Sequence, residues 1–159
     1  MTWYAGVLLA AVALGAIYAF LVCPRVPRRS LGKLAGRDYA HRGLWNAQRP
    51  ENSLPAFAAA AEAGYGIELD VHLTRDDVLV VFHDDTLERM CGVPDRVEEK
   101  TLKELQQLRL SGSGESIPTL DQVLETVAGR VPLIVEIKAD KRLTELCRRT
   151  RERLRAYGG

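Results

Sequence analysis

The fold is decided by residues 41–84, which read HRGLWNAQRPENSLPAFAAAAEAGYGIELDVHLTRDDVLVVFHD. Residues 66–74 alternate between apolar and polar side chains, which is typical of a strand with two different faces. Ser53 is a good N-cap, and apolar side chains follow it at helical spacing as far as Gly64. The continuous apolar run 78–82 is typical of a buried strand. This stretch therefore predicts a helix followed by two strands.

The alternation of strands and helices continues on both sides of this stretch. We predict further elements, in chain order, at 38–41 (strand), 101–108 (helix, with a capping box of Thr101 and Glu104), 119–128 (helix, with a capping box of Thr119 and Gln122), 132–137 (strand) and 143–157 (helix). Such alternation predicts a parallel α/β architecture. The connection from Asp70 to Val80 is too short for a crossover helix, so the pattern by itself predicts a hairpin there.

Composition limits the class of protein. The chain has 159 residues and a formal net charge of +1, which gives no reason to expect a nucleic-acid partner. The three cysteines lie far apart and form no C-x-x-C pair. We therefore predict free thiols in a reducing compartment.

The N-terminal segment predicts a membrane anchor. Residues 3–22 carry no charged side chain, and a helix needs about 20 such residues to cross a bilayer. Trp3 and Tyr4 lie at one end, and a basic segment with two prolines follows the other end. The positive-inside rule then predicts a single-pass protein whose remaining part is cytoplasmic. A cleaved signal peptide is the alternative, disfavoured because no basic residue precedes the apolar run. We expect a transmembrane helix at 1–23, a basic linker at 24–36 and one domain at 37–159.

Three carboxylates form a candidate metal site. Glu68 and Asp70 lie two apart on one strand, so both point to the same side. Glu136 lies near the end of a later strand. Carboxylates on one inward face repel each other unless a cation or a proton joins them, and oxygen ligands suit Mg²⁺ or Ca²⁺. The alternative is a set of salt bridges to nearby arginines. His72 shares this face, and we interpret it as filling the interior because a hard cation prefers oxygen.

Two histidines form a candidate acid/base pair. His41 and His83 each end a predicted strand, and in parallel α/β folds such ends face the ligand. Imidazole titrates near neutral pH, which suits proton transfer. Arg42 and Lys138 could bind an anion such as phosphate, or could instead pair with the carboxylates of the metal site. The arginine-rich helix at the C-terminus is interpreted as a solvated face, with attraction to anionic lipid as the alternative.

The ordered motifs resemble one enzyme family. They are His41-Arg42-Gly43, Pro50-Glu51-Asn52, Glu68-x-Asp70-Val71, His83-Asp84 and Glu136-x-Lys138. Each is weak alone, but the ordered set is similar to that of the glycerophosphodiester phosphodiesterase family. The resemblance runs from about Tyr39 to Lys138.

The resemblance implies a TIM-barrel (β/α)8 hydrolase that splits glycerophosphodiesters into glycerol 3-phosphate and an alcohol. It implies a divalent metal on Glu68, Asp70 and Glu136, with His41 and His83 as general base and acid. It implies further roles for two pairs of residues: phosphate binding by Arg42 and Lys138, and support of the site by Glu51 and Asn52. It also implies that such a barrel tolerates the short Asp70–Val80 connection, which overrides the hairpin prediction.

The chain is short for such a barrel. A TIM barrel takes about 250 residues, so we expect only about the first half, ending after the fourth strand and its helix. A fragment of a longer protein, self-association of half barrels and an inactive remnant are three explanations. Two alternative functions follow: a related phospholipase-type phosphodiesterase acting on a lipid-derived substrate, and a non-catalytic phosphodiester-binding module.

Overall fold

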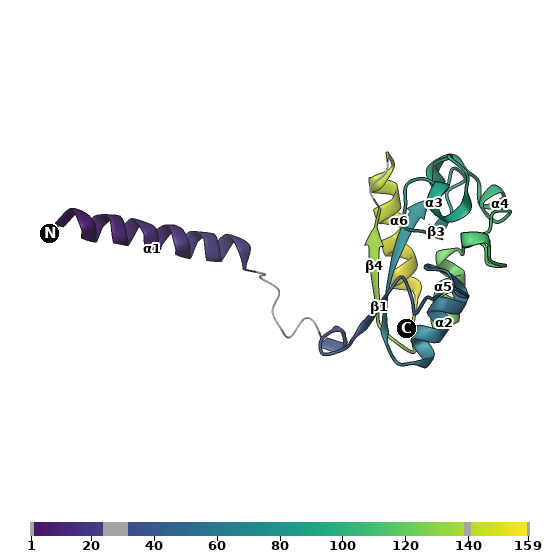
Figure 1. The fold of residues 1–159 in the computed structure, drawn as a ribbon, viewed down its shortest axis with the longest axis horizontal. Helices are drawn as coiled ribbons and strands as arrows, with labels where there is room; N and C mark the ends of the chain where they lie inside the picture. Colours follow the sequence, from purple (N-terminus) through teal and green to yellow (C-terminus); the bar gives the residue numbers. More distant parts are fainter. Residues whose placement is uncertain (1, 24–31, 139–140, 159) are drawn as a thin grey trace. The chain divides into compact units, whose positions relative to one another are not determined.

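The computed structural model describes residues 2–23, 32–138 and 141–158. The chain divides into two compact units, residues 1–35 and 36–159 (Figure 1). The first unit contains helix α1 (Thr2–Val22) and a short 3₁₀ helix, η2 (Gly32–Leu34). Within α1, Trp3–Val22 has a mean hydropathy of 2.4 and is long enough to cross a membrane, although a signal sequence would have the same properties. Most of the predicted basic linker, residues 24–31, lies outside the described residues.

The second unit is built around a central strand, β2 (Gly66–Leu73). Strands β1 (Tyr39–His41) and β4 (Leu133–Ile137) both pair with β2 in parallel. Strand β3 (Leu79–Val81) pairs with the last residues of β2 in the antiparallel direction. Seven of the eight residues of β2 are buried, and Glu68 alone is partly exposed.

The β2–β3 hairpin corrects one expectation. The pattern of residues predicts this hairpin, and the expectation from the family resemblance, which overrides the hairpin, is wrong. The reason lies in the turn: Thr74 N donates to Val78 O at 3.0 Å, and the Thr74 hydroxyl accepts from Val78 N at 2.8 Å. Asp77 takes the left-handed conformation that closes the turn, with φ 67°. The described residues therefore contain three parallel strands, not the four expected.

Side-chain caps begin the two helices that lie next to each other beside the sheet, α2 (Leu54–Glu62) and α5 (Leu120–Val127) (Figure 1). Ser53 accepts a hydrogen bond from Ala56 N, and Thr119 forms a capping box with Gln122. These caps satisfy N–H groups that would otherwise lack a partner. Both helices begin where the sequence predicts.

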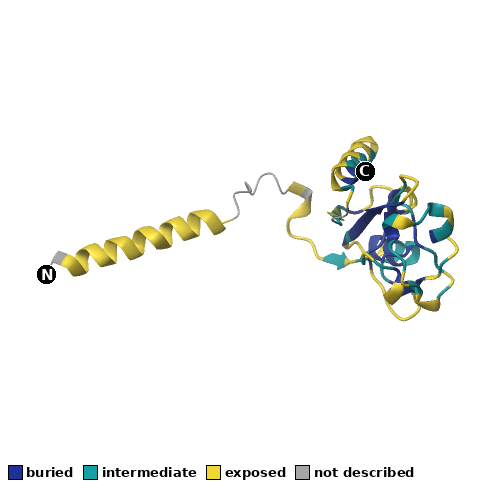
Figure 2. Cartoon of the chain, turned by 90° about the horizontal axis from the view of Figure 1, so that it is seen from above, coloured by how far each residue is buried: buried dark blue, intermediate teal, exposed yellow. Residues whose placement is uncertain are grey.

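Apolar faces of these helices and of β2 form the main core (Figure 2). A second core cluster lies under the segment between β3 and α5. This segment holds four one-turn helices: α3 (Glu88–Cys91), η3 (Val97–Glu99), α4 (Leu102–Leu105) and η4 (Leu110–Gly112). The predicted helix at 101–108 is thus shorter than expected, although its capping box at Thr101 is present.

Helix α6 (Leu143–Ala156) carries the arginine-rich sequence. Leu146 and Thr150 are buried, whereas Arg148 pairs with Glu145 and Glu152 at 2.6 and 2.7 Å. Arg149 pairs with Glu145 at 2.5 Å. These are ion pairs between residues three or four positions apart on one helix. Carboxylates on the same helix therefore balance much of its positive charge.

All three cysteines are free, as predicted. Burial raises the pKa of the Cys91 thiol to about 11, whereas Cys147 is exposed. Since the thiolate is the nucleophile, we expect iodoacetamide at pH 8 to alkylate Cys147 and to leave Cys91 unmodified until the chain is unfolded in urea. Peptide mass spectrometry measures both. Equal labelling of the two thiols in the folded chain would contradict the burial of Cys91.

Candidate active site

The carboxylates predicted for the metal site lie close together. Asp70 of β2 pairs in register with Glu136 of β4, and Glu68 lies two residues before Asp70 on the same face. One oxygen from each of the three carboxylates lies within 4.8 Å of the others. The side chain of Asp70 is completely buried, that of Glu68 is 15% exposed and that of Glu136 is 54% exposed. The cluster therefore reaches from the interior to solvent.

The electrostatics of this cluster favour a cation. Burial, followed by the charge of Asp70, raises the pKa of Glu68. Lys138 Nζ lies 2.8 Å from Asp70 Oδ1 and 2.5 Å from Glu136 Oε1. Burial alone would lower the pKa of Lys138, but its contacts with these two carboxylates outweigh burial and raise it.

The donor set fits a hard divalent cation. All three side chains offer carboxylate oxygens, the ligands that Mg²⁺ and Ca²⁺ prefer. Asp70 Oδ1 is buried and lies 2.8 Å from the ammonium group of Lys138. A buried carboxylate oxygen is costly unless a cation meets it, and among the described residues Lys138 is such a cation. The predicted alternative of salt bridges is partly realised, since Asp70 also lies 3.7 Å from Arg42 Nε.

His41 ends β1 beside this cluster. It pairs in register with Glu68, and its Nε2 lies 3.8 Å from Glu68 Oε2. The His41 side chain is 65% exposed. Its imidazole is therefore accessible to a ligand that binds at the carboxylates.

The antiparallel strand β3 brings His83 back toward the same edge of the sheet. Phe82 N donates to Asp70 O at 3.0 Å, and His83 follows directly. His83 Nδ1 lies 2.5 Å from Asp84 Oδ1. Burial alone would raise the pKa of Asp84, but hydrogen bonds from Arg89 and His83 outweigh it and lower the pKa. An ionised Asp84 can only accept, so we assign the proton to Nδ1, which leaves Nε2 for a ligand.

The loop after β1 ties Arg42 to β2. Arg42 has φ 61°, and its N–H donates to Glu68 O at 3.0 Å and is 3.2 Å from Glu68 Oε2. Gly43 has φ 84°, and a Cβ there would lie 2.9 Å from the backbone of Ala56. Only glycine fits this close approach of loop and helix.

Glu51 and Asn52 reach the site from the end of this loop. Glu51 Oε1 accepts from Arg42 Nη1 at 2.9 Å. Asn52 is buried with φ 54°, and its Nδ2 donates to Asp70 Oδ2 at 2.9 Å. Burial alone would raise the pKa of Glu51, but hydrogen bonds from Arg89 and Arg42 leave it lowered.

The sequence interpretation missed Arg89. Its Nε and Nη2 donate to the two oxygens of Asp84 at 2.6 and 3.1 Å, and Nη2 also donates to Glu51 Oε1 at 2.6 Å. Glu51 lies 38 positions away in the chain, and α3 is a single turn without apolar periodicity. The only sequence signal was an arginine close behind the His83-Asp84 pair.

His72 lies apart from the carboxylate cluster. It is buried, and its Nε2 lies 3.5 Å from the backbone oxygen of His83. The described residues that gather as metal-ligand candidates are the three carboxylates alone. The interpretation of His72 as an interior residue agrees with this position.

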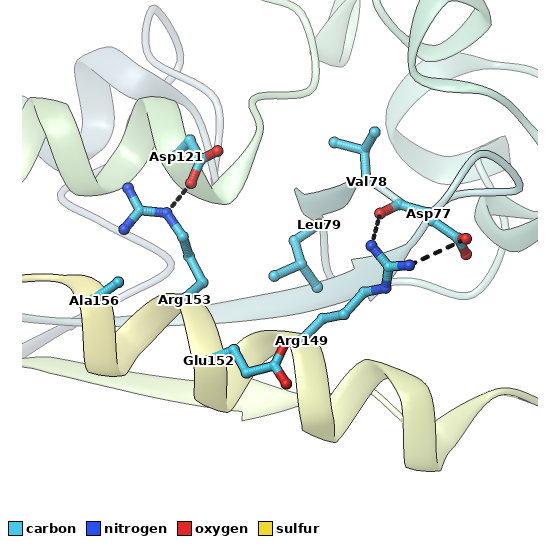
Figure 3. A pocket seen from close by; sticks show the side chains of 8 residues that line it. All are labelled: Asp77, Val78, Leu79, Asp121, Arg149, Glu152, Arg153 and Ala156. Atoms are coloured by element: carbon cyan, nitrogen blue, oxygen red, sulfur yellow. Dashed lines mark hydrogen bonds and ion pairs between the residues drawn. The ribbon is translucent and has the colours of Figure 1, made fainter.

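A cavity among the described residues lies elsewhere. It has a volume of about 420 Å³ and is lined mainly by α6 and the start of β3 (Figure 3). Ion pairs of Arg149 with Asp77 and of Arg153 with Asp121 lie along its wall (Figure 3). None of the predicted site residues lines it. The candidate site is therefore defined by converging side chains at the sheet edge and not by this cavity.

Comparisons with known proteins agree with the motifs. Residues 41–155 match the model of the glycerophosphoryl diester phosphodiesterase family. A glycerophosphodiester phosphodiesterase of Caldanaerobacter subterraneus is 42% identical over 108 residues, which cover 63% of this chain and 44% of the relative. A human lysophospholipase D is 30% identical over 160 aligned residues, covering 89% of this chain and 49% of the relative.

Solved structures give the same result. A phosphodiesterase of Oleispira antarctica, in complex with the product sn-glycerol-3-phosphate, matches with a TM-score of 0.69 and 32% identity over 76% of this chain and 52% of that protein. A glycerophosphodiester phosphodiesterase of Thermotoga maritima matches with a TM-score of 0.65 and 35% identity, over 76% of this chain and 50% of that protein. These relatives are TIM barrels, so the predicted fold class is confirmed as part of such a barrel. The chain spans about half the length of the relatives it matches.

Proposed function

Because the chain belongs to the glycerophosphoryl diester phosphodiesterase family, we propose that it hydrolyses glycerophosphodiesters to glycerol 3-phosphate and an alcohol, with the help of a divalent cation. The observation that carries this proposal is the gathering of three carboxylate oxygens within 4.8 Å of one another, next to His41. A phosphodiester is an anion, so attack on its phosphorus requires neutralisation of charge.

Glu68, Asp70 and Glu136 would hold Mg²⁺ or Ca²⁺, which would supply Lewis-acid stabilisation of the phosphoryl charge. Lys138 already lies between Asp70 and Glu136, and its ammonium group meets a phosphate oxygen on the exposed side. Arg42, held by Glu51, contributes a second fixed positive charge. Asn52 keeps Asp70 in place through its amide.

The two histidines move the protons. His41 accepts the proton of the attacking hydroxyl, either water or the neighbouring glycerol hydroxyl, as the P–O bond forms. His83, carrying a proton on Nε2 as well as on Nδ1 for this step, donates the Nε2 proton to the leaving alkoxide as the other P–O bond breaks. The assignment of His83 as the acid is supported by Asp84, whose carboxylate accepts from Nδ1 and so leaves Nε2 to face the substrate.

We further propose that α1 anchors the chain in a membrane, with residues 37–159 as the cytoplasmic catalytic domain behind the basic linker 24–36. The length and apolar composition of α1 support this, together with the basic residues that follow it in the sequence.

A second candidate is a lipid-derived substrate. The human relative, named a lysophospholipase D, aligns with 89% of this chain, and an anchored site would meet such substrates at the bilayer surface. Comparing glycerophosphocholine with lysophosphatidylcholine as substrates separates the two candidates. Analysis of linear against cyclic phosphate products also separates them, because only attack by the neighbouring hydroxyl forms a cyclic phosphate.

Self-association is a further proposal. Among the described strands, β4 pairs with β2 alone, and Ile134 of β4 is 43% exposed. A free strand edge of this kind can accept another chain.

The test of the proposed function uses the whole chain in detergent micelles. Release of glycerol 3-phosphate from glycerophosphocholine is measured with Mg²⁺, with Ca²⁺ and with excess EDTA. We expect release that depends on one of the cations and stops with EDTA. No release from a folded chain under any of these conditions would contradict the proposal.

A further inference from the structure

Arg89 joins two loops that are far apart in the sequence. Its guanidinium group binds Asp84 side-on, with Nε and Nη2 on separate carboxylate oxygens at 2.6 and 3.1 Å. The same Nη2 reaches Glu51 Oε1 at 2.6 Å. Asp84 follows β3, whereas Glu51 lies in the loop between β1 and α2. One side chain thus fixes the position of one loop relative to the other.

The bonds continue to both ends of the site. Asp84 accepts from His83 Nδ1 at 2.5 Å, and Glu51 accepts from Arg42 Nη1 at 2.9 Å. Negative and positive groups therefore alternate from Asp84 through Arg89 and Glu51 to Arg42. Arg42 lies in turn 3.7 Å from Asp70. A continuous set of ion pairs thus runs from His83 to the buried carboxylate of the metal site.

Burial gives these bonds their strength. The Glu51 side chain is 12% exposed and that of Asp84 is 21% exposed, whereas Arg89 is 47% exposed. Partly buried carboxylates lose hydration and need strong donors in compensation. A lysine ammonium is a point charge that cannot reproduce the planar, side-on contact of a guanidinium group. Arg89 is the most exposed of the three side chains.

We infer that Arg89 is a positioning residue, which orients the imidazole of His83 by holding Asp84 in place against Glu51. Arg89 does not touch the reacting atoms. It fixes the Asp84 carboxylate, which in turn keeps a proton on Nδ1 of His83 and directs Nε2, the atom that exchanges a proton in the proposed reaction, to the substrate. The expected effect of Arg89 on catalysis rests on the proposed function, whereas its expected effect on the His83 ring does not.

The first experiment is independent of activity. Nitrogen NMR of the ¹⁵N-histidine-labelled whole chain in micelles reports the tautomer of each of the three histidines. We expect His83 to carry its proton on Nδ1 in the wild-type chain, and to become a mixture of tautomers in Arg89→Met. Arg89→Lys keeps the charge and is expected to lie between the two. Should Arg89→Met not fold, Arg89→Lys decides the question.

Arg96→Met is the matched control. Arg96 also pairs with two carboxylates, Asp85 and Glu98 at 3.5 and 3.2 Å, and its side chain is 38% exposed. The hydrogen bonds and ion pairs of its side chain among the described residues go to Asp85 and Glu98 and not to Asp84, Glu51 or His83, so its loss is expected to leave the His83 ring unchanged. An unchanged His83 tautomer in folded Arg89→Met or Arg89→Lys would overturn the inference, as would an equal change in Arg96→Met.

The second experiment measures hydrolysis of glycerophosphocholine. Misplacing a catalytic group by about 1 Å can cost ~10²-fold in rate, so we expect kcat to fall by ~10²-fold in Arg89→Met, with a smaller change in KM and partial recovery in Arg89→Lys. A normal kcat in Arg89→Met contradicts the positioning role. If the wild-type chain shows no hydrolysis, the proposed function fails, and the NMR result still decides the role of Arg89 in orienting His83.

Discussion

Replacing His41 by alanine is expected to lower the rate of glycerophosphodiester hydrolysis by ~10²–10⁴-fold, the contribution typical of a general acid or base. The side chain is 65% exposed, so its removal leaves no buried cavity and the fold is expected to remain intact. Initial rates of glycerol 3-phosphate release at saturating metal measure the effect, and circular dichroism measures the fold.

A matched control for His41→Ala is Gln48→Ala. Gln48 is an exposed residue of the same loop after β1, and its loss is expected to leave the rate unchanged. A folded His41→Ala variant that hydrolyses substrate at the wild-type rate would rule out His41 as the general base.

The second large effect is expected at Glu68. Burial and the charge of Asp70 raise its pKa in the folded chain, so its ionised form opposes folding. That destabilisation is absent at pH values below the ordinary pKa of 4.5 and grows as the pH rises through the raised value. In EDTA at pH 7, Glu68→Gln is therefore expected to be at least as stable as the wild type.

With divalent cations present, the wild type is expected to become more stable than Glu68→Gln. A ligand at 100 times its dissociation constant stabilises the folded state by ~2.7 kcal/mol, and Glu68→Gln removes one of the three carboxylates. We expect the affinity for the cation to fall by more than ~10–100-fold, which is the typical loss when a residue that hydrogen-bonds to a metal ligand is removed. Urea unfolding with Mg²⁺, with Ca²⁺ and with EDTA measures both effects. Glu62→Gln, an exposed carboxylate of α2, is the control with the same change of charge.

Local signals predicted much of the fold. The caps at Ser53, Thr101 and Thr119 are present, because a cap depends on residues three positions apart. The alternation in β2 placed Glu68 and Asp70 on one face, since strand periodicity is a local property. These are the elements for which sequence spacing and spatial distance coincide.

Non-local contacts account for what the sequence did not reveal. The bond between Arg89 and Glu51 crosses 38 positions, and no periodic pattern connects them. The one-turn helices between β3 and α5 are too short to show an apolar stripe. The hairpin shows the opposite case: its turn residues indicated it correctly, and the family resemblance led to the wrong expectation.

The hairpin also explains how His83 reaches the site. The last residue of a strand parallel to β2 would lie at the edge of the sheet where β2 ends. Strand β3 is antiparallel to β2 and runs away from that edge. Strand β2 continues beyond its pairing with β4, which ends at Val71. The hairpin returns from that extension, so that Phe82 meets Asp70. His83 is thus positioned by the extra length of β2.

The most direct test of the central claim is calorimetric titration of Mg²⁺, and separately Ca²⁺, into the whole chain in micelles. The account predicts one ion bound per chain through Glu68, Asp70 and Glu136, with binding lost in Glu68→Gln and kept in Glu62→Gln. A folded wild-type chain that binds neither cation at millimolar concentration, or that binds equally well without Glu68, would contradict it.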